Sequence, residues 1–151
     1  MNGFEFFTGT WNVHNKRLTK WLAGSDEWEE FPGRSVASSH FAGGAHFDEV
    51  EFPTKGFSGL TVRLFDVDER RWTIHWASTR TGRFDPPMSG TWQGDRGEFY
   101  GDDQHQGTPV RARFIWTRIS ADEARWEQAF SVDGEKTWET NWIMELTRVA
   151  D

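Results

Sequence analysis

Apolar and polar residues alternate with a period of two along most of this chain. The clearest stretches are LTVRLFDV (60–67), RWTIHWAS (71–78) and VRARFIWTR (110–118). A period of two is typical of β-strands that bury one face. We therefore expect Leu60 and Leu64, like Trp72 and Trp76, to point into a common core.

Turn-forming segments separate these stretches at short intervals, among them PTKGFSG (53–59) and TGRFDPP (81–87). Only KRLTKWLAG (16–24) predicts one or two turns of helix, with Gly24 at its end. We count nine or ten strands joined by hairpin-length connections. Because a Greek-key sandwich usually needs some long connections, the pattern predicts an all-β fold: a single antiparallel up-and-down β-barrel of about eight to ten strands in one domain.

The composition predicts a core built from a few large rings. The chain has 10 Trp and 13 Phe but one Tyr, and only 36% of its residues are hydrophobic. Acidic residues number 24 and basic residues 17, so the formal charge of −7 argues against a nucleic-acid partner.

The sequence has no cysteine, which excludes disulfides and thiolate metal sites and fits a reducing compartment. Its start does not match a signal peptide, and it contains no apolar run of membrane-spanning length. We expect a cytoplasmic protein with no membrane partner.

The segment RWEQAFSVDGEKTWETNW (125–142) predicts a hairpin rich in tryptophan. The expected cross-strand pairs are Phe130 with Trp138, Gln128 with Thr140, and Trp126 with Trp142. All three pairs would share one face, with Glu127 and Asn141 on the other. Cross-strand aromatic pairs of this kind stabilise a sheet by up to about 1 kcal/mol each.

The turn of this hairpin resembles the Asp-box, written S-x-D-x-G-x-T-W. Ser131, Asp133, Thr137 and Trp138 match, whereas Glu135 stands in place of the motif's glycine. The resemblance implies a structural hairpin without catalytic function. Asp133 is expected to accept hydrogen bonds from backbone amides of the turn.

Both ends of the chain resemble lipocalins and other calycins. GTW (9–11) is similar to the G-x-W signature of their first strand, over which an Arg or Lys of the last strand packs. Arg148 in MELTRV is the expected partner of Trp11. Together with LFD, WAS, DPP, FYG and the Trp-rich hairpin, these motifs resemble a lipocalin-like (calycin superfamily) family of bacterial proteins of unassigned function. The resemblance implies a calycin-type barrel and supplies no catalytic residues.

A barrel of this size can be filled by side chains or can hold one small ligand. The tryptophans can therefore form a solid core or line a cavity. Gln128 and Thr140 favour a cavity, because they fall among rings and a buried amide needs a partner. The leading prediction is a barrel that binds a small hydrophobic or aromatic molecule without a cofactor. The predicted ligand-binding residues are Trp76, Trp92, Trp116, Trp126, Gln128, Thr140 and Trp142.

The charged residues of the strands are expected on the solvated outer face, since they alternate with apolar ones. This prediction covers Arg63, Arg111, Arg113 and Glu127. If Arg111 and Arg113 instead turned inward, their guanidinium groups would suit a carboxylate.

Two other functions are alternatives. An isomerase or cyclase acting on a hydrophobic substrate inside the barrel would use His75 or Glu127 for proton transfer. A haem carrier similar to nitrobindin-like barrels is the other, although their glycine-rich opening motif is absent. His40, His46, Asp48 and Glu49 have no metal-ligand spacing, so we interpret them as ordinary polar residues and predict no metal site.

Overall fold

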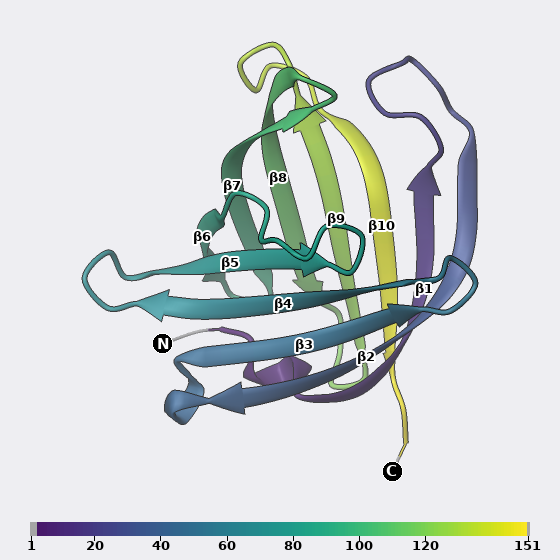
Figure 1. Ribbon diagram of the computed structural model, residues 1–151. Helices are drawn as coiled ribbons and strands as arrows, with labels where there is room; N and C mark the ends of the chain where they lie inside the picture. The colour runs from purple at the N-terminus through teal and green to yellow at the C-terminus, as the bar shows by residue number, and fades with distance from the viewer. Residues whose placement is uncertain (1–2, 151) are drawn as a thin grey trace.

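The computed structural model describes residues 3–150, which form a closed barrel of ten antiparallel strands (Figure 1). The strands are β1 (Gly9–Leu18), β2 (Trp28–His40), β3 (Ala45–Phe52), β4 (Phe57–Asp66), β5 (Arg71–Ser78), β6 (Met88–Gln93), β7 (Arg96–His105), β8 (Thr108–Arg118), β9 (Glu123–Ser131) and β10 (Glu139–Arg148). Each strand pairs with its neighbours in sequence, and β1 closes the barrel by pairing with β10. The predicted all-β up-and-down barrel is confirmed.

The helix predicted over residues 16–24 is wrong. Residues 16–18 continue β1, and the described helices are two short 3₁₀ turns, η1 (Glu5–Phe7) and η2 (Phe41–Gly43). Arg17 pairs with Glu29 of β2 on one side and with Trp142 of β10 on the other. Pairing along both edges outweighs the weak helical propensity of a short segment. No helix in residues 3–150 is long and apolar enough to cross a bilayer.

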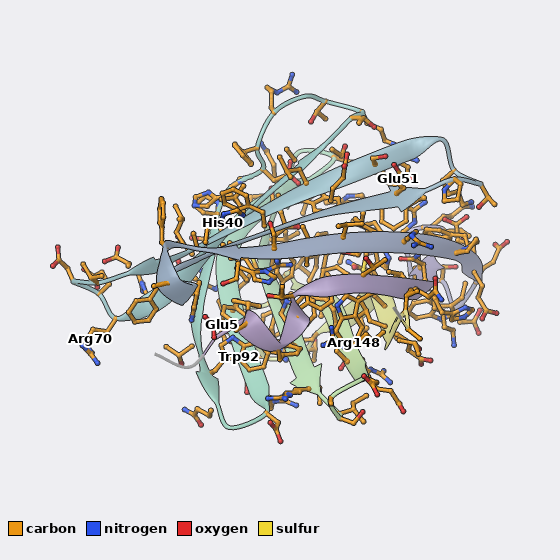
Figure 2. All side chains as sticks on the ribbon, turned by 90° about the horizontal axis from the view of Figure 1, so that it is seen from below. Glu5, His40, Glu51, Arg70, Trp92 and Arg148 are labelled. Atoms are coloured by element: carbon orange, nitrogen blue, oxygen red, sulfur yellow. The ribbon has the colours of Figure 1, made fainter. Side chains whose placement is uncertain are left out.

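One end of the barrel is closed by η1 and the residue before it. Phe4 and Phe7 are almost completely buried there. The ring of Phe4 lies 5.1 Å from that of Trp72 and 5.3 Å from that of Trp92, both edge to face. Figure 2, seen from below, shows η1 crossing this end, near the labelled Trp92. Because these aromatic rings pack densely, this end of the barrel is a hydrophobic core.

The predicted contact between Trp11 and Arg148 is confirmed. The two residues are paired between β1 and β10, and the Arg148 guanidinium lies 4.4 Å from the centroid of the Trp11 ring. Arg148 also donates hydrogen bonds to the carbonyls of Phe6 and Thr8, each at 2.7 Å. The Trp11 indole donates to the Phe7 carbonyl at 2.9 Å. The last strand therefore fixes η1 in place.

The face predicted for β4 is wrong, although its period is right. Leu60 and Leu64 lie on the outside, 43% and 37% exposed, whereas Arg63 is 3% exposed and points inward. Arg63 pairs with Ile74 of β5, and Ile74 shares the inner face with Trp72. Because opposite residues of an antiparallel pair lie on the same side of the sheet, the large residues of β5 set the inward face of β4.

The register of the β9–β10 hairpin differs from the prediction. A bulge between Thr140 and Trp142 places Trp142 opposite Gln128 and leaves Asn141 buried. An extra residue on one strand shifts every later pair and can turn a side chain to the other face. Before the bulge, Glu139 and not Trp138 lies opposite Phe130, so Trp138 does not join the inner rings. It lies 4.4 Å from the Arg113 guanidinium, which is on the outer face.

The turn itself forms as predicted. Asp133 Oδ1 accepts hydrogen bonds from the backbone amides of Lys136 and Thr137, at 3.1 and 2.9 Å. The hydrogen bond from the Thr137 hydroxyl, followed by these backbone bonds, lowers the pKa of Asp133 to about 2. Glu135, at the position of the motif's glycine, has a positive φ of 70°, a conformation that glycine adopts at no steric cost.

Candidate functional site: a two-sided cavity inside the barrel

The barrel contains a cavity of about 280 Å³. Phe7 and Trp116 lie at its floor, where their rings approach to 5.0 Å and separate the cavity from the core around η1. Trp21 also lines the cavity, and it belongs to the loop 19–27 that follows β1. Figure 1 shows this loop at the end of the barrel away from η1, and we call this end the mouth. The interior is thus solid at one end and hollow toward the other.

Strands β8, β9 and β10 provide an aromatic wall. The Trp126 ring lies 5.1 Å from that of Phe114 and 5.8 Å from that of Trp142, both edge to face. The Trp142 indole donates a 3.0 Å hydrogen bond to Asn15 Oδ1, and the Asn15 amide donates to the Phe31 carbonyl at 3.1 Å. These bonds fix the ring of Trp142 against β1 and β2.

Trp76 extends the aromatic lining to the mouth from β5. Its ring lies directly over Gly59 of β4, where an added Cβ would come within 1.8 Å of the indole. Glycine at this position therefore leaves the space that the ring occupies.

Strands β2, β3 and β4 provide a polar wall on another side of the same cavity. Arg63 donates from Nη2 to Asp48 Oδ1 at 2.5 Å, and the Ser35 hydroxyl donates to Asp48 Oδ2 at 3.0 Å. Thr61 lies on the same wall, opposite Asp48 in the sheet. All four side chains are buried and line the cavity. Burial of this ion pair requires such bonds, because an unpaired buried charge is strongly unfavourable.

His46 completes the network behind this wall. Its Nδ1 lies 3.0 Å from Arg63 Nη1, and its Nε2 lies 3.4 Å from the Thr8 hydroxyl. Burial, followed by repulsion from Arg63 and His40, lowers the pKa of His46 to about 3. The ring is therefore neutral at neutral pH, and its Nδ1 can accept a hydrogen bond from the guanidinium.

The mouth is acidic. Asp85 lies in the loop after β5, Asp103 lies near the end of β7, and both line the cavity. Burial and then repulsion from Asp103 raise the pKa of Asp85, with Arg83 opposing the shift. Within residues 3–150, neither carboxylate forms an ion pair. His105 stands beside them, with its ring 5.4 Å from that of Trp21.

Five of the seven predicted ligand-binding residues line this one cavity: Trp76, Trp116, Trp126, Gln128 and Trp142. Trp92 belongs to the core at the closed end, where its ring packs against Phe6 and Phe99. Thr140 is paired with Ala129 just before the bulge and does not line the cavity. The Gln128 amide has a protein partner, because it donates to Asn141 Oδ1 at 2.9 Å.

The residues suggested for proton transfer lie outside the barrel. His75 alternates with the inward Ile74 and Trp76, and its ring packs against the exposed Phe84 at 5.9 Å. Glu127 lies 3.4 Å from Arg125 on the outer face of β9. Neither side chain lines the cavity, so the predicted isomerase or cyclase loses its mechanism.

Arg111 and Arg113 occupy the outer face, as predicted. Arg111 forms ion pairs with Asp102 at 3.2 Å and with Glu135 at 3.8 Å. No set of three His, Asp or Glu residues in the described part of the chain is placed to hold a metal ion.

Sequence reasoning missed the polar wall because it assigned Arg63 to the outer surface. One signal was present. His46, Asp48 and Val50 alternate with Phe47 and Glu49 in β3, so a polar and partly charged set shares a face with Val50. Register between strands decides which set is inside, and a single strand does not contain that information.

No protein-family model matches this chain, and no curated protein matches it.

Proposed function

We propose that this protein is a small-molecule-binding barrel that holds a hydrophobic or aromatic ligand in the cavity. The observation that carries the proposal is the aromatic wall, which is ordered and faces open space instead of other side chains. Ligand pockets typically enclose about 300–1,000 Å³, line it with apolar rings and add a few polar groups. A cavity of about 280 Å³ suits a guest of one or two fused rings.

The family resemblance is part of the same proposal. The up-and-down topology and the stacking of Arg148 on Trp11 are what a lipocalin-like calycin barrel requires. We also propose, from the lack of cysteine and the acidic composition, that the protein works in the cytoplasm.

Calorimetric titration with naphthalene tests the proposal. Ala112 is 2% exposed and lines the cavity from β8, so Ala112→Phe would fill space that the guest needs. Thr91→Phe is the matched control, because Thr91 is exposed on the outer face of β6. We expect naphthalene to bind the wild type and the control and to lose binding to Ala112→Phe. Absence of binding by naphthalene and by a panel of one- and two-ring aromatics would contradict the proposal.

A further inference from the structure

We infer that the cavity selects an uncharged aromatic molecule with a hydroxyl or carbonyl group, and that this group binds at Thr61 on the polar wall. The inference rests on the proposed function and adds the chemical class of the ligand. It depends on three features: a free polar group in the cavity, the position of the rings, and the charge along the path that a guest follows.

Thr61 is the free polar group. Its side chain is 7% exposed and lines the cavity. Among the described residues, its hydroxyl has no hydrogen-bond partner, whereas the hydroxyl of the neighbouring Ser35 is bonded to Asp48. This hydroxyl is open to the cavity, and covering it without a partner is costly, so a ligand that supplies a hydrogen-bond partner gains binding free energy over one that does not.

Arg63 adds no net charge to the same wall. Its Nη atoms are bonded to Asp48 and His46, but its buried Nε has no partner within residues 3–150. The charge of Arg63 is compensated by Asp48, and both oxygens of that carboxylate are already occupied. The wall is therefore polar without a net charge, which suits an uncharged oxygen atom better than a carboxylate.

The aromatic wall orients the rest of the guest. Rings of Trp116, Trp126 and Trp142 come from β8, β9 and β10, whereas Thr61 and Arg63 come from β4. A planar molecule can contact these rings with its body and still direct one polar edge toward β4. A wholly apolar guest would bury Thr61 without giving its hydroxyl a partner.

The charge at the mouth disfavours anions. Asp85 and Asp103 flank the mouth, and their mutual repulsion contributes to the raised pKa of Asp85. Arg17, Lys20 and Arg80 line an adjoining hollow that shares Trp21 and His105 with the cavity, and Arg17 is paired there with Glu29 at 2.7 Å. A carboxylate that enters between Asp85 and Asp103 passes two carboxylates that form no ion pair within residues 3–150, and this part of the path is repulsive.

The test compares three probes that share one ring system: naphthalene, 2-naphthol and 2-naphthoate, titrated calorimetrically at pH 7.5. We expect 2-naphthol to bind about tenfold more tightly than naphthalene, the ratio that a satisfied buried hydroxyl supplies. We expect 2-naphthoate to bind most weakly. Thr61→Val should abolish the preference for 2-naphthol and bind naphthalene at least as tightly as the wild type does, because the two side chains have nearly the same shape and the valine has no hydroxyl to leave without a partner.

Two controls separate binding chemistry from folding. Thr61→Ser keeps a hydroxyl and should keep the preference, and Thr91→Val makes the same replacement on the outer face of β6. Equal binding of naphthalene and 2-naphthol by the wild type would overturn the inference and leave the proposed function intact. Tightest binding by 2-naphthoate would overturn the charge argument. If none of the three probes binds, the proposed function fails as well.

Discussion

The two ends of the barrel use the same residue type for different purposes. At the closed end, Trp11 and Trp72 are 0% and 1% exposed and their rings contact phenylalanines carried on and next to η1. Toward the open end, Trp76 and Trp126 also point inward, but they border the cavity. Ten tryptophans in one chain are therefore neither all core nor all pocket.

The two ends differ because side chains fill the space along the barrel axis at the closed end only. The segment around η1 inserts Phe4 and Phe7 between the strands and completes the packing there. At the other end the loops 19–27 and 79–87 contribute Trp21, Asp85 and Pro86 to the mouth. Stability should therefore depend most on the closed end, and ligand affinity on the open end.

Removal of a ring should separate the two ends most clearly. Trp11→Ala should lower the free energy of unfolding by about 3–5 kcal/mol, because it leaves a large cavity in a packed core. Trp76→Ala should cost well under half as much, since that ring is only partly buried and borders open space. Urea denaturation followed by circular dichroism measures both. Equal losses would contradict the division of the barrel into a core end and a cavity end.

The buried ion pair of Arg63 and Asp48, which lies between the two ends, provides the next test. Arg63→Met should destabilise the protein by about 3–5 kcal/mol, because Asp48 would remain buried without a countercharge. The double variant Arg63→Met, Asp48→Leu should recover most of that loss, since well-packed apolar residues can replace a buried pair. Denaturation of the two single variants and the double variant gives the coupling free energy. Additive losses would show that the two charges do not depend on each other.

A smaller effect is expected from His46, which lies between the polar wall and η1. The pKa of His46 is about 3 in the folded protein, below the ordinary value of 6.5. Between these two pH values, the unfolded chain binds a proton at this residue that the folded chain does not. The free energy of unfolding should therefore be constant above pH 6.5 and fall as the pH drops toward 3, by at most about 1.4 kcal/mol per pH unit.

The measurement for His46 is best made between pH 7.5 and 5, above the range in which the lowered pKa values of Glu29, Glu98 and Asp133 take effect. His46→Asn should flatten the slope over this interval. An unaltered slope in His46→Asn would show that another group titrates on unfolding.

The local pattern of the sequence was enough to predict most of the fold. The period of two located the strands and short connections implied the meander. The pairing of Trp11 with Arg148 was expected from the resemblance to calycins. The errors arose where pairing with other strands determines how far a strand extends and which residues face each other. Closure of the barrel extended β1 through Arg17. In the β9–β10 hairpin the pairing is shifted from the expected register, with a bulge at Asn141.

The site was predictable only on its aromatic side. Trp76, Trp116, Trp126 and Trp142 were identified because large rings on an inward face either pack or line a cavity. Arg63 was assigned to solvent, since a charged residue in a strand normally faces water. Its burial depends on two residues of β3, His46 directly opposite and Asp48 two positions further along, a relation that involves two strands and their register.

The most direct test of the account is an NMR titration of the indole N–H signals with naphthalene, since the ten tryptophans report on both ends at once. We predict that the signals of Trp76, Trp116, Trp126 and Trp142 shift in proportion to occupancy while those of Trp11 and Trp72 stay in place. Shifts confined to the outer Trp138, or equal shifts at the closed end, would contradict a guest inside the barrel.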